Sequence, residues 1–546
     1  MQNLPRNGGV VRLQQDLERN RCLRRWLAIL AAICTCWAMN NGFCAEAADP
    51  ILDLLLKKGL ITEGEAQKVQ AEVEAIRTNQ AAPPLPESKW KISTGIKSVE
   101  LFGDIRARFE QRTAEDPDHG RIDLNRARYA VRVGLRGEVF DDFYYGFRLE
   151  TAANPRSPWV TFGTSSSGVP YQGPFGKSTA GFDIGQAYIG WRPADGVDIT
   201  VGKMPNPLYT TPMVWDNDLN PEGVAEHFKY SVGEADFFAN FGQFIYQDTN
   251  PTKTSPGYFN LGYDSSVPPF LLAWQAGINY HLTKTISLKV APVLYNYTGH
   301  GVNTTAPGSV VAPDFTGTFV GQGATNNLAG NNTGAWSGYP QGYYDGFIAN
   351  QTGIRDLLVL EVPAELNFKM EKINVRLFGD YAQNLKGAER AQAAYAAAIS
   401  AFTPSDAPGG GIAPIPAAQI HDNKAYQIGI GVGSAGPLYG PMQGLVYGTT
   451  SQKHAWEIRT YWQHVEQYAL DPNLVDSDFF EGRENLEGIY AAVAYSFTAN
   501  TIGTVRYGHA RRINDKLGTG GSNQDIPQMN PIEYYNLLQV DLTFRF

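Results

Sequence analysis

Cysteine is absent from most of this sequence, because all four cysteines lie within the first 44 residues. The rest of the chain therefore has neither a disulfide framework nor a cysteine-based metal site. Charged residues are also scarce, at 18% of 546 residues, and the formal net charge is −9. That acidic balance argues against a nucleic-acid-binding protein, whose surface should be basic. Beyond residue 47 no apolar run approaches the roughly 18 residues that predict a membrane-spanning helix.

Turn-forming and aromatic residues are abundant instead. The chain contains 57 glycines, 33 prolines and 12% aromatic residues, and 43% of its residues are hydrophobic. This composition suits a large all-β protein better than a helical enzyme, and it excludes disordered and collagen-like classes. The hydrophobic fraction is sufficient for a protein core or for a belt that faces lipid.

The first 47 residues predict a secretory signal peptide. Arg21, Arg24 and Arg25 form a basic stretch, residues 27–39 are apolar, and Ala-Glu-Ala at 45–47 has the small-x-small pattern of a cleavage site. An uncleaved anchor helix is the alternative, but this apolar run is shorter than the roughly 20 residues needed to span a bilayer. Cleavage leaves 39 of the 45 basic and 51 of the 54 acidic residues, so the exported chain carries a net charge of −12.

Residues 48–88 predict a short periplasmic helical segment that precedes the main domain. Thr62 and Glu65 have the spacing of a capping box, and apolar residues recur at helical spacing up to about residue 77. Three prolines within 81–86 then predict a stiff extended spacer. A helical hairpin at the mouth of the main domain is the favoured interpretation, and a coiled-coil or cell-wall contact is the alternative.

From residue 99 onward apolar and polar residues alternate, which is the period of a β-strand. Within 99–110 the odd positions are apolar or small and the even positions are charged, except at Phe102. Within 126–139 the odd positions are again apolar or small. The opposite face of that second segment carries four arginines, Arg126, Arg128, Arg132 and Arg136.

We predict sixteen strands along the rest of the chain: 99–112, 124–140, 143–152, 182–192, 197–207, 223–231, 236–246, 270–282, 285–297, 355–370, 374–384, 424–434, 454–466, 486–498, 501–510 and 534–546. Most are longer than the roughly 5–6 residues of a soluble strand and match the roughly 9–11 that cross a bilayer obliquely. Because every backbone polar group in hydrocarbon must be paired, such strands have to close into a barrel. The predicted fold is an all-β transmembrane antiparallel barrel.

The connections between these strands alternate in length. Turns such as 141–142 and 499–500 are short, whereas loops such as 153–181 and 298–354 are long. Outer-membrane barrels have this pattern, with short turns on the periplasmic side and long loops outside. The 19 residues of 435–453 break it, because they fall where a turn is expected. A hidden strand pair in that link would raise the count to 18.

Three consecutive blocks, 185–193 (GQAYIGWRP), 202–207 (GKMPNP) and 214–224 (VWDNDLNPEGV), resemble a bacterial family catalogued as "putative porins". The helical segment before the strands, the arginine-bearing second strand and the terminal aromatic also resemble that family. The resemblance implies a pore in the outer membrane of a Gram-negative cell. It further implies that Phe546 is the sorting signal read by the barrel-insertion machinery. It does not name a solute.

No enzymatic motif accompanies this pattern. None of the eight histidines belongs to an HExxH pair, and no serine-hydrolase elbow is present. Asp471, Asp476, Asp478 and Glu481 have carboxylates suited to a hard cation such as calcium, but their spacing matches no EF-hand. An acidic extracellular loop is the favoured interpretation there, and residues 216–218 are interpreted as turn formers. We predict no catalytic residue, cofactor or metal.

The predicted function is therefore a porin, a water-filled channel for passive diffusion of small hydrophilic solutes or ions. The alternative is a structural anchor whose barrel tethers the periplasmic segment. A gated receptor is excluded because residues 48–98 are too few for a plug domain. General porins are commonly homotrimers, and the partners expected otherwise are outer-membrane lipid, the insertion machinery and the solutes.

Selectivity is expected to depend on charged side chains that face the lumen and on any loop that folds inward. The loop 298–354 is the candidate for such a constriction, and a mobile surface loop is the equal alternative. The lumen charges either pair and cancel, or form an arginine strip that faces acids across the channel and favours anions. The predicted pore-lining residues are Arg106, Arg108, Arg126, Arg128, Arg132, Arg136, Arg148, Glu100, Asp104, Glu110 and Glu150.

Overall fold

The computed structural model describes fourteen stretches of the chain: residues 95–117, 119–140, 142–152, 156–163, 181–246, 270–298, 357–391, 422–434, 441–449, 452–515, 517–519, 525–526, 529 and 531–546. The predicted signal peptide, the predicted helical segment 48–88 and all but the first residue of the predicted constriction loop lie outside these stretches. Among the described residues, no helix combines the length and the apolar character needed to cross a membrane.

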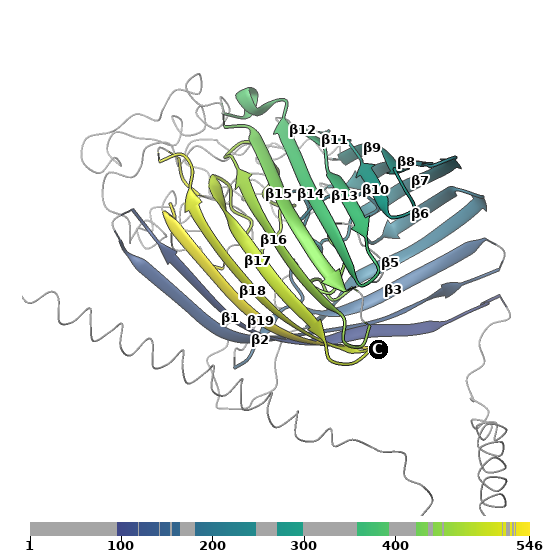
Figure 1. Ribbon diagram of the computed structural model, residues 1–546, viewed down its shortest axis with the longest axis horizontal. Helices are drawn as coiled ribbons and strands as arrows, with labels where there is room; N and C mark the ends of the chain where they lie inside the picture. The colour runs from purple at the N-terminus through teal and green to yellow at the C-terminus, as the bar shows by residue number, and fades with distance from the viewer. Residues whose placement is uncertain are drawn as a thin grey trace, which may run out of the picture. The chain divides into compact units, whose positions relative to one another are not determined.

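The described strands form one antiparallel sheet that closes on itself (Figure 1). Strand β1 (Glu100–Glu115) pairs with β2 (Arg121–Glu138) on one side and with β19 (Tyr534–Arg545), the last strand of the chain, on the other. No edge is left along this closing pair, where Ala107 is opposite Leu542 and Phe109 is opposite Val540. The predicted closed barrel is confirmed.

The other strands follow in chain order around the barrel: β3 (Phe143–Ala152), β4 (Val160–Thr161), β5 (Gly181–Ala194), β6 (Val197–Lys203), β7 (Glu222–Val232), β8 (Ala235–Ile245), β9 (Phe270–His281), β10 (Ile286–Val290), β11 (Val293–Tyr297), β12 (Leu358–Glu361), β13 (Ala364–Lys369), β14 (Ile373–Asn384), β15 (Lys424–Ser434), β16 (Trp456–Val465), β17 (Leu486–Ser496) and β18 (Thr501–Arg512). Two of the predicted spans, 143–152 and 424–434, are reproduced to the residue.

Prolines explain why more strands are labelled than cross the barrel wall. Pro292 separates β10 from β11, and Pro363 separates β12 from β13, because proline has no N–H for the ladder. Each interrupted pair continues along the same neighbours, β9 on one side and β14 on the other. Counted as continuous crossings, and without the two-residue β4, the barrel has sixteen strands. The 18-strand alternative is wrong, since residues 441–449 contain no strand.

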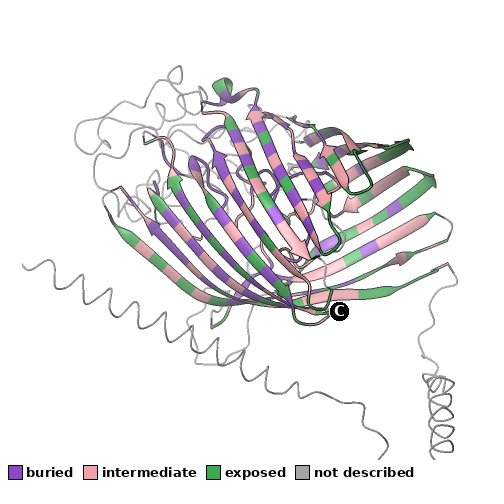
Figure 2. Ribbon diagram, in the orientation of Figure 1, coloured by how far each residue is buried: buried purple, intermediate pink, exposed green. Residues whose placement is uncertain are grey.

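Alternate residues of each strand are exposed and buried, which appears as banding along the arrows in Figure 2. On β1 the outward Leu101 is 59% exposed, whereas the inward Glu110 is fully buried. On β19 the outward Leu542 is 52% exposed and the inward Asp541 only 5%. The apolar face therefore points away from the barrel, toward lipid, and the polar face points into the lumen. A lipid-facing arginine at mid-depth would cost about 2–4 kcal/mol.

Connections of two kinds separate the two rims of the barrel. Residues 195–196, 233–234 and 370–372 are short turns, and they lie at the rim that also holds the C-terminus (Figure 1); we call it the turn rim. Gly196 there adopts a φ of +75°, as two-residue hairpin turns often require. The opposite rim, the loop rim, carries longer connections such as 204–221 and 466–485. The predicted strand 197–207 is too long, because residues 204–207 already belong to such a loop.

Candidate functional site

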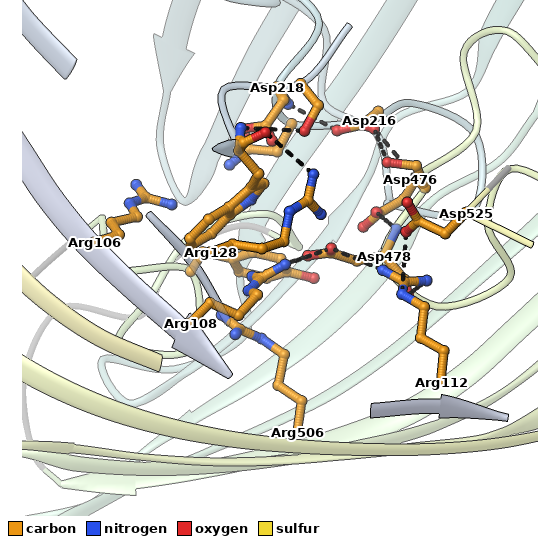
Figure 3. Close-up of a pocket in the computed structure, with 15 residues that line it drawn as sticks. Arg106, Arg108, Arg112, Arg128, Asp216, Asp218, Asp476, Asp478, Arg506 and Asp525 are labelled. Atoms are coloured by element: carbon orange, nitrogen blue, oxygen red, sulfur yellow. Dashed lines mark hydrogen bonds and ion pairs between the residues drawn. The ribbon is translucent and has the colours of Figure 1, made fainter. Parts of the chain in front are cut away.

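Five arginines on neighbouring strands line one side of a cavity inside the barrel (Figure 3). We call them the arginine wall: Arg106, Arg108, Arg112, Arg128 and Arg506. Arg106, Arg108 and Arg112 occupy even positions of β1, so they share the inward face. Pairing of β1 with β2 and β19, and of β19 with β18, brings Arg128 and Arg506 beside them. The cavity encloses about 670 Å³ of empty space, including its opening to solvent.

The loop 204–221 leaves the loop rim and folds into the lumen rather than outward. The backbone N–H of Tyr209 donates to Gln275 Oε1 at 2.9 Å, and Gln275 Nε2 donates to the Tyr209 carbonyl at 2.8 Å. Thr210 donates to Glu361 at 2.6 Å, and Thr211 donates to Asp380. These acceptors lie on the inward faces of β9, β12 and β14, so the loop is anchored to the barrel wall.

Aromatic packing holds the same loop in place. Trp215 is 98% buried, and its ring contacts those of Phe244 and Tyr295 with centroids 6.3 and 6.4 Å apart. The indole N–H donates to the Leu219 carbonyl at 3.0 Å, which closes the turn around residues 216–218. Burying one such side chain stabilises a fold by several kcal/mol, about 3–5 when judged by truncation to alanine. The turn predicted at 216–218 is confirmed, and it lies inside the barrel.

A second loop, 466–485, also folds inward and is joined to the first. The Asp216 N–H donates to the Leu474 carbonyl at 2.5 Å, and the Asp476 N–H donates to the Pro212 carbonyl at 3.1 Å. Ser477 donates to Asp216 Oδ2 from both its backbone N–H and its hydroxyl, each at 3.2 Å. The two loops therefore present their acidic residues as one surface. Residues 471–481 thus lie in a connection of the loop rim, and this acidic loop folds into the lumen.

Aspartates from these two loops, and one from the connection between β18 and β19, face the arginine wall across the cavity. The acidic lining consists of Asp216, Asp218, Asp476, Asp478 and Asp525. In Figure 3, Asp216, Asp218 and Asp476 lie together on one side, and Arg108 and Arg506 lie on the other. Cations on one wall and carboxyl groups on the other create a transverse electric field, because the lumen between them is narrow and its walls have a low dielectric constant.

Several of these charges are paired across the lumen. Arg108 Nη1 donates to Asp478 Oδ1 at 2.8 Å, and Arg112 Nε lies 3.1 Å from Asp525 Oδ2. Arg108 also donates to Asp541 on the barrel wall at 2.8 Å. Asp218 accepts a 2.5 Å hydrogen bond from Arg132, which stands outside the cavity lining. Partial cancellation, one of the two expected outcomes for the lumen charges, therefore applies to these groups.

Arg128 is less closely paired than Arg106 and Arg108, whose nearest carboxylates lie 2.6 and 2.8 Å away. Its Nη1 lies 3.5 Å from Glu110 Oε1, its Nη2 donates to the Trp159 carbonyl at 3.2 Å, and its Nε has no hydrogen-bond acceptor among the described residues. The Trp159 ring packs beneath Arg108, with Cζ 4.0 Å from the ring centroid. Such a cation–π contact holds the Arg108 guanidinium in place. Arg128 thus combines a position in the cavity lining with a long ion pair of 3.5 Å.

The loop carboxyls differ in how readily they ionise. Burial, reinforced by the negative charge of Asp218, raises the pKa of Asp216 to about 7. Burial and the neighbouring Asp216 likewise hold the pKa of Asp476 well above its ordinary value. Burial acts in the same direction on Asp478, but Arg108, Arg506 and Arg112 outweigh it and hold its pKa below the usual range. Asp478 therefore ionises more readily than Asp216 or Asp476 does.

The predicted pore-lining residues fall into three groups in the structure. Arg106, Arg108 and Arg128 line the cavity. Arg126 and Glu110 form an ion pair next to it. The remaining residues lie on the inward face closer to the turn rim and pair locally: Arg106 with Asp104, Arg132 and Arg148 with Glu150, and Arg136 with Glu100.

Sequence reasoning missed several residues that line this cavity. Arg112 and Arg506 follow the same alternation as the predicted arginines and were identifiable by it. Trp159, Tyr447 and Asp525 lie in connections, where no period shows which way a side chain points. The acidic residues at 216–218 and 476–478 were visible as clusters, but nothing local shows that loops 260 residues apart meet. Among the described residues, no group of three or more metal-ligating side chains is arranged to hold a metal ion.

Comparisons with solved structures return bacterial porins at low sequence identity. An anion-selective porin from Comamonas acidovorans has 10% identity and a TM-score of 0.38, covering 82% of this chain and 99% of that one. OmpF of Salmonella typhi, solved in complex with daunomycin, has 11% identity and a TM-score of 0.39, covering 83% of this chain and 98% of that one. Among curated proteins, none matches this sequence.

Residues 110–546 match the family described as "Putative porin". The matched region begins within β1 and includes every later strand of the barrel. It also includes the three blocks on which the resemblance was based, and that resemblance is confirmed. With a closed barrel of sixteen membrane-crossing strands and a polar lumen, this chain belongs to the porin family and forms a channel in the outer membrane.

Proposed function

We propose that the arginine wall and the inward loops 204–221 and 466–485 form the constriction of this porin. Small hydrophilic solutes and ions would diffuse passively between them, and anions would pass more readily than cations. The observation that carries the proposal is the cavity itself, which has guanidinium groups on one side and carboxyl groups on the other. A solute in such a passage is drawn by its charge toward one wall and has its dipole oriented by the field.

Charge balance near neutral pH supports the preference for anions. The lining contains five arginines, all of them charged, and five aspartates. Burial raises the pKa of Asp216 to about 7 and favours the neutral form of Asp476, which reduces the negative charge that opposes the guanidinium groups. Arg128 is the member of the wall that we expect to attract anions most, because its carboxylate partner Glu110 is 3.5 Å away and is shared with Arg112 and Arg126. The chain's acidic total charge does not oppose this, because charges beyond a Debye length of about 8 Å are screened.

We also propose the following roles for the other parts of the chain, as the sequence predicted them. Residues 1–47 act as a cleaved signal peptide, 48–88 as a periplasmic segment with a cell-wall contact as one use, and 89–546 as the barrel domain. Glu100, Asp104, Arg136, Arg148 and Glu150 line the vestibule on the turn side of the constriction. The channel is not an enzyme, and its expected partners are lipid, the insertion machinery, its solutes and two further copies in a homotrimer.

Planar-bilayer recording of the purified protein tests the proposal. Insertion should produce ohmic current steps, and a salt gradient should give a reversal potential of the sign set by faster anion passage. A reversal potential of opposite sign would contradict the anion preference while leaving the pore intact. Reproducible insertion without any current would overturn the channel and favour the alternative, a structural anchor with a sealed lumen.

A further inference from the structure

Connections of the turn rim are short, but the link between β15 and β16 is long. It runs from residue 435 to 455, whereas the other connections there have between two and four residues. Of this link, the structure describes 441–449, which we call the rim segment, and 452–455. The rim segment is compact: Gly444 N–H donates to Thr449 Oγ1 at 2.8 Å, and the φ values of Gly444 and Gly448 are +115° and +66°.

Two arginines on the inner wall hold the rim segment by its backbone. Arg459 donates to the Pro441 carbonyl at 2.6 Å and to the Gln443 carbonyl at 2.7 Å. Arg506 donates to the Val446 carbonyl at 2.6 Å. Both arginines are inward-facing, because their strand neighbours Ile458 and Val505 are exposed on the lipid face. The rim segment therefore lies inside the barrel, against β16 and β18.

Further contacts tighten this attachment. Val446 N–H donates to Glu457 Oε2 at 3.2 Å, and Glu457 itself binds Arg459. Leu445 and Val446 are buried. Arg459 Cζ lies 4.8 Å from the Tyr447 ring centroid, so the guanidinium that holds the carbonyls also positions the ring. A buried guanidinium that loses its acceptors is strongly destabilising, which keeps the rim segment bound.

The tip of the rim segment reaches the constriction from the opposite rim. Tyr447 lines the same cavity as Asp216 and Asp476, which enter from the loop rim. The rim segment also occupies N–H donors of two lumen arginines. Its carbonyl oxygens accept hydrogen bonds from Arg459 and Arg506, and these N–H groups would otherwise face the channel. The rim segment therefore narrows the channel and also shields the positive charge of these two arginines from solutes.

We infer that residues 441–449 are a second constriction element, built from the turn side, and that Tyr447 sets the bore against the inward loops. The inference rests on the proposed function, since it concerns the same passage. In addition, the narrowest point of the channel is formed from both rims, and the long link on the turn rim helps to select solutes by size.

A cysteine placed at the tip tests the position of Tyr447. Residues 45–546 contain no cysteine, so a single introduced thiol is the only target once the leader has been removed. Tyr447→Cys should react with an anionic methanethiosulfonate reagent added from the turn side, and the reaction should lower the single-channel conductance by roughly half or more because the adduct occupies the bore. Tyr507→Cys is the control, because that ring is 51% exposed on the outer face. Equal conductance before and after modification of Tyr447→Cys would overturn the inference.

Excision of 441–449 tests the two effects together. The flanking residues 435–440 and 450–455 still join β15 to β16, so the strands need not move. Conductance should rise about twofold or more as the bore widens, and the preference for anions should also rise, because Arg459 and Arg506 lose their carbonyl acceptors. Unchanged conductance and reversal potential would contradict the inference. A silent wild-type barrel would instead contradict the proposed function, and the cysteine experiment stands even if the excised variant does not fold.

Discussion

Arg128 and Arg132 lie four residues apart on the same face of β2, yet their surroundings differ. Arg132 forms ion pairs with Asp218 at 2.5 Å and Glu150 at 3.5 Å and stands outside the cavity lining. Arg128 lines the cavity, and its closest carboxylate, Glu110, is shared with Arg112 and Arg126. Strand alternation predicted that both face the lumen, but it contains no information about which carboxylate each would meet.

Arg128→Gln should reduce the preference for anions without closing the channel. One charge about 5 Å from an ion in water-like surroundings contributes about 0.8 kcal/mol, roughly a fourfold change in local anion occupancy. The reversal potential in a salt gradient measures the change. Arg136→Gln is the matched control, because it lies on the same strand and face but roughly 26 Å further toward the turn rim. Equal shifts of the reversal potential in both variants would show that the arginine wall affects selectivity only through the total charge of the lumen.

Asp216 makes the selectivity depend on pH. Burial raises its pKa to about 7, so the carboxyl is neutral at pH 5 and ionised at pH 8.5. The added negative charge above pH 7 should weaken the preference for anions, and Asp216→Asn should remove that step. Asp478, whose pKa the nearby arginines hold below the usual range, does not contribute to this step. Reversal potentials at the two pH values measure the effect, with Asp195→Asn on the turn rim as control. A pH step that persists in Asp216→Asn would exclude this carboxyl as its source.

At the scale of elements, strands and loops differ in what the sequence predicts. Strand positions followed from alternation, and most predicted ends lie within about three residues of the observed ones. The inward course of the loop 204–221 could not be predicted, because it depends on Gln275, Glu361 and Asp380, which are 66 to 169 residues from their partners in the loop. The sequence offered 298–354 as a candidate constriction loop, with a mobile surface loop as the equal alternative, and the structure describes only its first residue.

Gln275→Leu should loosen the loop 204–221. The substitution leaves the N–H and carbonyl of Tyr209 without their partners, and each unpaired buried group costs about 1–3 kcal/mol. We expect a lower thermal unfolding temperature and noisier open-channel current, because the loop can leave the wall. Gln383→Leu is the control, since it makes the same chemical change on the outward face of β14. A quiet channel with unchanged thermal stability in Gln275→Leu would show that the other anchors suffice.

At the scale of the whole molecule, the terminal residue belongs to the seam of the barrel. Phe546 N–H donates to the Gly103 carbonyl at 3.1 Å, and Gly103 N–H donates to the Phe546 carbonyl at 3.0 Å. The Phe546 side chain is 44% exposed and lies near Phe544 on the outer face. The residue thus completes the ladder at the turn rim, and its proposed role as a sorting signal is additional to this structural one.

Deletion of Phe546 should lower the yield of heat-modifiable barrel in the outer membrane and leave periplasmic aggregates or degradation products. Phe546→Tyr should restore most of the yield, because it keeps a terminal aromatic ring and both backbone hydrogen bonds. Phe544→Ala is the control, since it removes an aromatic residue from the same face and leaves the terminus intact. A deletion variant with normal yield would contradict the assignment of Phe546 as an assembly signal.

Closure of the barrel by its first and last strands also has a kinetic consequence. Arg108 and Asp541, which meet across that seam, are 433 residues apart in the chain. The β1 edge emerges early during export and has to wait for the final strand, so the slowest contact joins the two most distant parts of the polypeptide. Until then its unpaired N–H and carbonyl groups are open to other chains. Copies of this chain that are truncated or stalled during export therefore expose an unpaired strand edge. Rapid arrival of the C-terminal strand is needed to prevent their aggregation.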